Sequence, residues 1–202
     1  MAEICTSRLR LRLPQPEDAE PLSQLMTPAI SARLASWPPY LNPVTAQLRV
    51  DEAVAAHAHG LCLPFVVTRL ADAEVLGWIS ACRAEADPRR AILTYWVGEP
   101  FHGQGIMREA APAALAAVFR DLDVTEVRAA VQTDNDASHA VLRALGMQPL
   151  GPGRIWCAAR GREETCEWWS VHRAEGRPSA GADLGYVVPS LPGAFAAAGA
   201  AL

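Results

Sequence analysis

The chain has 202 residues, half of them apolar and a fifth of them charged, which suits a single soluble domain with one core. Its net charge of −4 gives no long-range attraction to nucleic acid or to an anionic membrane, so we expect neither as a partner. All 18 basic residues are arginine, which excludes a Walker-type phosphate loop, a pyridoxal Schiff base and any mechanism that needs a lysine.

No segment is typical of membrane insertion, export or metal binding. The longest apolar stretches are rich in alanine and are interrupted by glycine, proline or arginine, so none predicts a transmembrane helix. The N-terminus lacks a basic flank followed by an apolar run, so we expect a cytoplasmic protein. The five cysteines and five histidines follow no ligand spacing, so we expect neither a metal site nor a disulfide framework.

Alternation and helical periodicity place a strand and two helices in the first third of the chain. Residues 8–13 alternate arginine with leucine, which predicts a strand with one buried and one exposed face. Acidic residues after Pro16 predict a helix start, and an apolar stripe extends this helix to about residue 26. The turn-rich, aromatic residues 36–43 then lead into a second helix over residues 44–59.

Short apolar runs and polar turns follow, and they predict an antiparallel meander. We expect its strands at residues 63–68, 75–82 and 91–97 and its turns at residues 71–73 and 87–90. The later elements are a helix over residues 106–119, a strand over 127–131, a helix over 136–145 and a hairpin with strands 155–158 and 165–172. Pro112 should kink the first of these helices, and Gly146 should cap the second. Together these elements predict an α/β (α+β) fold with a mixed, mostly antiparallel sheet flanked by helices.

The composition changes after residue 173. Alanine, glycine and proline dominate from there on, apart from one apolar patch at residues 184–188. We therefore expect one folded domain over residues 1–173 and a C-terminal tail over residues 174–202 that lies outside the main core. The apolar patch could dock on the domain itself or on a partner chain, which would suit a homodimer.

A glycine-rich turn stands between the third meander strand and the next helix. Gly103 and Gly105 let the backbone turn sharply and approach an anion, because no Cβ is in the way. The free N–H groups at the helix start point toward the same place. The candidate phosphate-binding residues are His102, Gly103, Gln104, Gly105, Ile106, Met107 and Arg108. The alternative is ordinary turn chemistry, and the third glycine of a dinucleotide fingerprint is missing.

Four blocks of sequence extend this pattern. They are residues 6–12 with 17–19, residues 95–97 with 101–110, residues 135–147, and residues 165–173. In this order they resemble the GCN5-related N-acetyltransferase (GNAT) superfamily, specifically its ribosomal-protein N-terminal alanine acetyltransferase branch. The resemblance spans residues 6 to 173 and follows the element order that periodicity predicts. It implies a GNAT-type fold, and acetyl-CoA as the acyl donor without a metal.

The resemblance also implies where the pantetheine arm of the cofactor binds. The backbone of Tyr95, Trp96 and Val97 would pair with the arm, and the N–H of Val97 would polarise the thioester carbonyl. Asn135 and Ser138 would lie near the sulfur, where Ser138 would protonate the leaving thiolate, directly or through water. The alternative is that Asn135 caps its helix and Ser138 is a polar residue of the first turn.

The sequence leaves the general base open. Glu109 matches the branch and is a candidate catalytic residue, but it could instead orient the phosphate turn. Glu163, Glu164 and Glu167 lie near the expected acceptor entrance, although surface exposure is the simpler explanation for each of them. An ordered water could serve in their place.

The aromatic loop at residues 36–43 is the candidate acceptor site. In the family a loop at this position forms a wall of the acceptor groove, so Trp37 and Tyr40 are candidate substrate-binding residues. Ordinary packing of the loop is the alternative.

We expect an enzyme that acetylates a primary amine by direct transfer, the amine being a protein N-terminus or a small molecule. A non-catalytic acyl-CoA-binding or protein-interaction module on the same fold is the alternative, and a binder of another nucleotide phosphate is a third. The intact glycines and the pair formed by Asn135 and Ser138 favour the enzyme.

Overall fold

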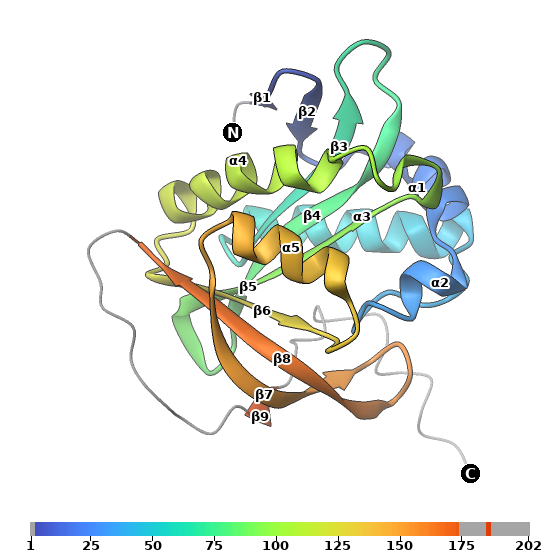
Figure 1. Cartoon of the computed structure of the whole chain (residues 1–202). Helices are drawn as coiled ribbons and strands as arrows, with labels where there is room; N and C mark the ends of the chain where they lie inside the picture. The colour runs from blue at the N-terminus through green and yellow to red at the C-terminus, as the bar shows by residue number, and fades with distance from the viewer. Residues whose placement is uncertain (1–2, 174–184, 187–202) are drawn as a thin grey trace.

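The computed structural model of the chain describes residues 3–173 and 185–186. Nine strands form one sheet in the order β1-β2-β3-β4-β5-β6-β8-β7-β9 (Figure 1). The strands are β1 Ile4–Cys5, β2 Leu9–Arg12, β3 Cys62–Arg69, β4 Val75–Ala84, β5 Asp87–Val97, β6 Glu126–Val131, β7 Gln148–Cys157, β8 Arg162–His172 and β9 Gly185–Tyr186. The helices are α1 Ala19–Leu25, α2 Pro28–Ser31, α3 Pro43–Ala58, α4 Ile106–Asp121 and α5 Asp136–Ala144, with short 3-10 helices η1 Pro16–Asp18 and η2 Glu99–Phe101.

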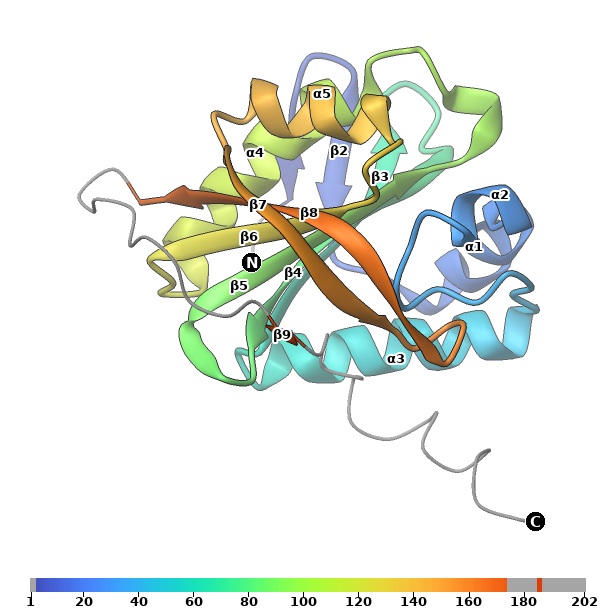
Figure 2. The same cartoon turned by 60° about the horizontal axis from the view of Figure 1, so that its bottom comes forward.

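Helices cover both faces of the sheet and create two cores. Helices α4 and α5 lie on one face, and α1, α2 and α3 lie on the other (Figure 2). The first core contains Phe65 and Met107, and the second contains Trp37, Trp78 and Trp96. Burying apolar side chains on both faces is the largest favourable contribution to such a fold. The expected mixed, mostly antiparallel sheet flanked by helices is confirmed.

Local capping explains where two of the helices begin. Asn42 precedes α3 and accepts a hydrogen bond from the N–H of Thr45, with Pro43 in the first helical position. Asn135 caps α5 in the same way, through the N–H of Ser138. In the part of the chain that the structure describes, no helix is long and apolar enough to cross a membrane.

The expected strands and helices are all present, but several details differ from the prediction. The turn expected at residues 87–90 is wrong, because Ala84 already faces Asp87 across the β4–β5 pair. The single turn α2 was not expected, and β7 is much longer than residues 155–158. Strand β7 extends through two prolines because β8 pairs with it along its length, with one irregularity in the register. Helix α4 runs through Pro112, as predicted, and ends at Asp121, two residues beyond the expected end.

The expectation of a chain without disulfides is also wrong for one pair. Cys62 and Cys82 are directly opposite each other on β3 and β4, and a disulfide joins them. Their separation of 20 residues says nothing about this contact, which depends on the register of the two strands. Cys157 and Cys166 are free and buried, as expected for small apolar side chains, whereas Cys5 is free and exposed.

Only a short piece of the predicted tail is described. Strand β9 pairs in parallel with β7 opposite Arg154 and Ile155. Residues 174–184 and 187–202 lie outside the described residues, and most of the apolar patch at residues 184–188 falls there. The domain boundary after residue 173 therefore stays a prediction.

The strands β5 and β6 separate part-way along their length, and this separation positions the site. Their parallel pairing covers only residues 90–92 with residues 126–128. Beyond that point β5 runs on to Val97 along β4, and β6 runs on to Val131 along β8. A wedge therefore opens in the middle of the sheet, between two strands that are each held from the other side.

Candidate active site

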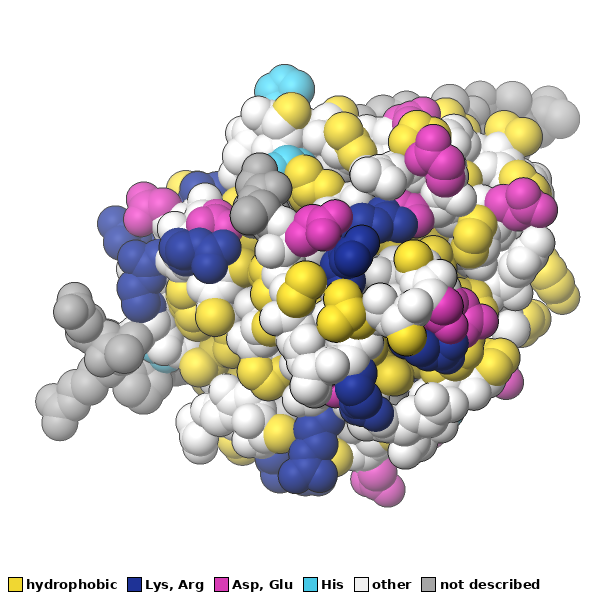
Figure 3. Space-filling model, turned by 90° about the horizontal axis from the view of Figure 1, so that it is seen from above, with side chains coloured by type: hydrophobic (Ala, Val, Ile, Leu, Met, Phe, Trp, Pro, Cys, Tyr) yellow, Lys and Arg dark blue, Asp and Glu magenta, His cyan; other side chains and the backbone are white. Residues whose placement is uncertain are grey.

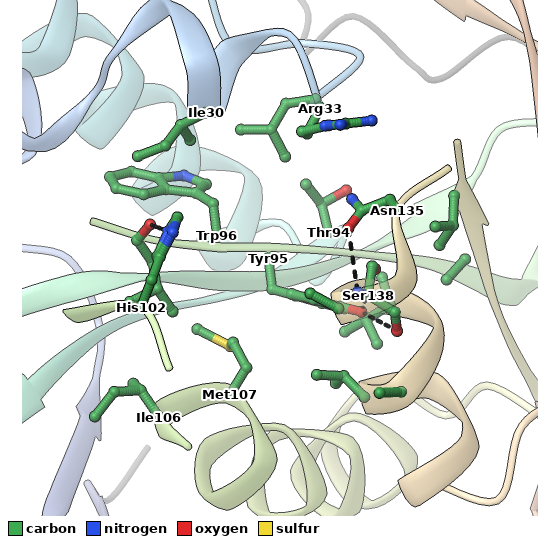
Figure 4. A pocket seen from close by; sticks show the side chains of 18 of the residues that line it. Ile30, Arg33, Thr94, Tyr95, Trp96, His102, Ile106, Met107, Asn135 and Ser138 are labelled. Carbon is green, nitrogen blue, oxygen red and sulfur yellow. Dashed lines mark hydrogen bonds between the residues drawn. The ribbon is translucent and has the colours of Figure 1, made fainter. Parts of the chain in front are cut away.

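A cavity of about 900 Å³ fills the wedge between β5 and β6. Tyr95 and Met107 line it and pack with the core under α4. Ile30 and Trp96 also line it but belong to the core on the opposite face of the sheet. Figure 4 shows these side chains around one space. The cavity therefore reaches both faces of the sheet, and two molecules could approach each other from opposite sides.

Most of the predicted cofactor residues line this cavity. They are Tyr95, Trp96, Val97, His102, Gly103, Gly105, Ile106, Met107, Arg108, Asn135 and Ser138. Gln104 instead donates its side-chain amide to the carbonyl of Pro100 and so stabilises the turn itself. The structure thus brings together residues from two of the sequence blocks, which are far apart along the chain.

The edge of β5 presents backbone groups to the wedge. The N–H of Gly98 donates to the carbonyl of Leu76 on β4. Because hydrogen-bonded positions alternate along an antiparallel pair, Tyr95 and Val97 direct their backbone groups away from β4 and toward the wedge. The ring Nε2 of His102 lies 2.9 Å from the carbonyl oxygen of Val97 and so connects the turn to the end of the strand.

The glycine turn has the conformation that the sequence predicts for a phosphate site. Gly103 and Gly105 have φ angles of 74° and 73°, in the region that side chains other than glycine rarely adopt. Gly105 is the N-cap of the 16-residue helix α4, so the first N–H groups of the helix have no partner within it. Arg108 and Arg143 line the same cavity. Unpaired N–H groups and two guanidinium groups that line one cavity favour an anionic ligand.

Glu109 lies behind this turn and holds the N-terminal strands to it. Its carboxylate accepts hydrogen bonds from the Thr6 hydroxyl at 2.5 Å, the Ser7 hydroxyl at 2.9 Å and the Arg8 backbone N–H at 2.9 Å, and forms an ion pair with the Arg8 Nε at 2.7 Å. Burial alone would raise the pKa of Glu109, but the hydrogen bonds from these donors outweigh burial and lower the pKa to about 2. Arg8 also donates to the carbonyl of Gln104. Figure 3 shows arginine and acidic side chains interspersed on the face that is seen from above Figure 1.

The expectation that Glu109 is a catalytic base therefore finds no support in its surroundings. A carboxylate with a pKa of about 2 is a very weak base, and Glu109 does not line the cavity. Its contacts agree with the alternative considered from the sequence, in which it orients the phosphate turn.

Two hydroxyl groups meet on the α5 side of the cavity. The Tyr95 hydroxyl lies 2.6 Å from Ser138 Oγ and 3.3 Å from the Ser138 carbonyl oxygen (Figure 4). Burial raises the pKa of Tyr95 to about 12, although the hydrogen bond to Ser138 lowers it in part. The Ser138 N–H is held by the Asn135 side chain. Asn135 is therefore a helix cap and a cavity residue at once.

The opposite side of the cavity is bordered by α2 and the residues that follow it, and contacts with two distant loops hold this segment in place. Arg33 binds Asp134 at 2.5 Å and Gln132 at 2.9 Å, both in the loop after β6. From the β7–β8 turn, Arg160 donates to the carbonyls of Ser31 and Leu34. These bonds fix the wall that contains Ile30, Arg33 and Leu34, which all line the cavity.

The two predicted acceptor residues do not line the cavity. Trp37 is only 4% exposed and packs edge-on against the rings of Trp78 and Trp96. Tyr40 is 81% exposed. The packing alternative therefore holds for Trp37, because three aromatic rings from distant segments bury one another. The neighbouring Ala35 and Ser36 do reach the cavity wall.

The three acidic residues near the β7–β8 turn are all paired with basic side chains. Arg160 and Arg162 bind Glu164, and the hydrogen bond from Arg160 lowers its pKa to about 2 although burial opposes this. Glu163 pairs with Arg154, and Glu167 lies 3.4 Å from His139. Of the described residues that line the cavity, only Glu99 has an acidic side chain. It accepts a hydrogen bond from the Thr27 hydroxyl. Residues 3–173 contain no cluster of three or more potential metal ligands.

Comparisons with known proteins agree with this geometry. The model of the acetyltransferase (GNAT) domain family matches residues 8–148. The chain belongs to the GNAT family. This GNAT chain, an N-acetyltransferase, is 25% identical over 174 residues to YdaF of Bacillus subtilis (strain 168), whose name places it with ribosomal N-acetyltransferases. The match covers 83% of this chain and 92% of YdaF.

Solved structures of acetyltransferases share the fold of this GNAT chain. RimL, a ribosomal L7/L12 α-N-protein acetyltransferase solved with coenzyme A, superposes with a TM-score of 0.73 at 24% identity over 85% of this chain and 98% of RimL. The microcin C7 self-immunity acetyltransferase MccE, solved with acetyl-CoA and AMP, gives a TM-score of 0.72 at 18% identity over 83% of this chain and 94% of MccE.

Several residues of the site could not be identified from the sequence. They are Arg8, Ile30, Arg33, Thr94, Glu99 and Arg143. Arg8 belongs to the first block that resembles the family, so its position was available as a signal but its contact with the turn was not. Arg33 and Glu99 lie in segments with no recognisable motif, and only the fold brings them to the cavity.

Proposed function

We propose that this GNAT chain transfers the acetyl group of acetyl-CoA directly to a primary amine, and that the reaction takes place in the wedge between β5 and β6. The observation that carries the proposal is the cavity that reaches both faces of the sheet. The donor would enter beside the glycine turn and the acceptor beside α2. The two substrates would then meet without a covalent enzyme intermediate.

In this proposal the protein holds the donor mainly through backbone groups. The N–H groups of residues 103–108 and the Arg108 side chain would bind the diphosphate. The free backbone groups of Tyr95 and Val97 would pair with the pantetheine arm, and the N–H of Val97 would polarise the thioester carbonyl. Complexes of RimL with coenzyme A and of MccE with acetyl-CoA support this choice of donor.

The chemistry then requires a neutral amine and a stabilised thiolate. The Ser138 hydroxyl would donate a hydrogen bond to the sulfur of the leaving thiolate. Because Glu109 and Glu164 are both paired with arginine and neither lines the cavity, we propose that water rather than either carboxylate takes the proton from the acceptor ammonium. Glu99 lines the cavity and would attract the ammonium by its charge.

We propose the N-terminus of a protein as the first acceptor class to test. The names of YdaF and RimL refer to ribosomal proteins, and RimL is named for the α-amino group of L7/L12. Peptides that begin with alanine or serine, offered with acetyl-CoA, are therefore suitable probes. Release of free thiol and a mass increase of one acetyl group on the peptide would identify the reaction. Binding of acetyl-CoA without any thiol release would favour the non-catalytic module instead.

Thermal unfolding with and without acetyl-CoA tests the donor site. At a concentration about a hundred times the Kd, the ligand should stabilise the folded state by roughly 2.7 kcal/mol. Gly105→Glu should abolish this shift, because it adds a carboxylate where the diphosphate would bind. Gly60→Glu is the matched control: Gly60 has a similar φ of 69°, with open space around it, and does not line the cavity. If acetyl-CoA does not shift the unfolding of the folded wild type, the proposed function is wrong.

A further inference from the structure

The contact between Tyr95 and Ser138 joins two elements that are distant in sequence. Tyr95 extends from β5 and Ser138 from the first turn of α5, 43 residues later. Both side chains line the cavity, and Figure 4 shows the phenol and the hydroxyl group directed toward each other. Their oxygens are 2.6 Å apart, a normal distance for a hydrogen bond between two hydroxyl groups.

The position of Ser138 is fixed before this contact is made. Its N–H donates to the Asn135 side chain, which caps α5. The first turn of the helix therefore sets the backbone, and the remaining freedom of Ser138 is the rotation of its side chain and of its hydroxyl group. A serine hydroxyl can donate one hydrogen bond and accept two, so its partner decides which way the hydrogen points.

The phenol is the better donor of the two groups. A tyrosine hydroxyl is far more acidic than the aliphatic hydroxyl of serine, whose proton does not titrate in the ordinary range. Burial raises the pKa of Tyr95 to about 12, so the phenol keeps its proton at neutral pH. When Tyr95 donates to Ser138 Oγ, the Ser138 hydrogen is released from Tyr95 and is free to turn into the cavity.

We infer that Tyr95 is a positioning residue that directs the Ser138 hydroxyl hydrogen toward the sulfur of the leaving thiolate. This inference rests on the proposed function. As the new C–N bond forms, the C–S bond breaks and its electron pair stays on sulfur, where Ser138 donates a hydrogen bond to it. The proton lost by the amine passes to water, and the thiolate takes a proton from water on release. Tyr95 and Ser138 therefore end the reaction in the protonation states in which they began.

Kinetics of Tyr95→Phe, Ser138→Ala and the double variant test the inference, with acetyl-CoA and the alanine- and serine-initiated peptides as probes. Each single substitution should lower kcat by roughly tenfold, because a hydrogen bond to the leaving group is lost or misdirected. The KM for acetyl-CoA and its thermal shift should change little, because the backbone holds the cofactor. The double variant should be no slower than Ser138→Ala, because Tyr95 acts through Ser138.

Two results would overturn the inference. Independent losses that multiply to roughly a hundredfold in the double variant would show that Tyr95 does not act through Ser138. A Tyr95→Phe variant with an unchanged kcat, or with only a raised KM and a lower melting temperature, would show a purely structural role. Ser23→Ala is the control for Ser138→Ala, since it removes the hydroxyl group of a helical serine outside the cavity.

The same experiment separates this inference from the proposed function. Wild-type protein that binds acetyl-CoA but releases no thiol, with either peptide or with water as the acceptor, would refute both. Wild-type turnover combined with an unaffected Tyr95→Phe variant would refute the inference alone.

Discussion

The two ends of the β5–β6 pair differ in what lies between the strands. At the closed end, residues 90–92 pair with residues 126–128, and the Glu126 carboxylate binds both Arg90 and Arg128. At the open end the strands enclose a cavity of about 900 Å³. The same two strands are therefore paired and packed at one end and leave space for a ligand at the other. We expect the ion pairs of Glu126 to hold the two strands together at the closed end.

Glu126 is the centre of the closed end. It is only 6% exposed, and burial alone would raise its pKa. The hydrogen bonds from Arg128 and Arg90 outweigh burial and lower the pKa, so the carboxylate stays charged at neutral pH. A buried carboxylate with two guanidinium partners tolerates the loss of any member poorly, because the remaining charges lose their compensation.

The largest effect should come from removing that carboxylate. Glu126→Ala should lower the free energy of unfolding by about 3–5 kcal/mol, since it leaves Arg90 and Arg128 without their shared partner. Urea denaturation measures this directly. Glu163→Ala is the control, because its ion pair with Arg154 is largely exposed and should contribute less than about 1 kcal/mol. Equal losses in both variants would mean that the closed end is not specially held.

A smaller loss of stability is expected from a substitution that displaces the end of β5 at the open end of the wedge. A Cβ at Gly77 on β4 would lie 2.3 Å from the carbonyl oxygen of Trp96 and 2.9 Å from the Cα of Val97. Gly77→Ala should therefore displace the end of β5, cost about 1–3 kcal/mol of stability and weaken acetyl-CoA binding. Calorimetric titration with acetyl-CoA checks the second effect.

Gly98→Ala provides the comparison for that variant. Its added Cβ would meet the flexible end of the Leu25 side chain, 2.6 Å away, which can move at little cost. A milder loss of affinity is expected than for Gly77→Ala. The reverse order would show that the position of the β5 backbone does not control cofactor binding.

The smallest effect concerns the tie between the N-terminal strands and the turn. The pKa of Glu109 lies at about 2, below its usual value of 4.5, so its contribution to stability is complete above about pH 4.5 and is lost as the pH falls toward 2. Glu109→Gln should cost about 1 kcal/mol at neutral pH and should flatten the fall of stability between pH 5 and pH 3. Urea denaturation across that range measures the slope.

Part of the acid slope should remain in Glu109→Gln. Glu164 also has a pKa of about 2 and contributes in the same pH range. Glu163→Gln should keep the slope of the wild type, because its exposed pair with Arg154 contributes little. A slope in Glu109→Gln that matches the wild type would show that the hydrogen bonds to Glu109 do not stabilise the fold.

The sequence by itself determined those features that depend on neighbours a few residues apart. Alternation over residues 8–13 predicted β2, the two glycines predicted the left-handed turn before α4, and Asn135 predicted the cap of α5. Each depends on backbone conformations and side-chain directions that repeat along one element. The resemblance to the GNAT superfamily came from such local blocks, in order, and the family match confirmed it.

Only the tertiary structure decided which distant groups meet. Tyr95 and Ser138 touch because β5 separates from β6 below α5, and Arg8 reaches the glycine turn because Glu109 holds it there. Trp37 is buried against two tryptophans from β4 and β5 and does not line the cavity. Strand register, sheet separation and burial depend on all the packed elements together, and no local pattern of residues encodes them.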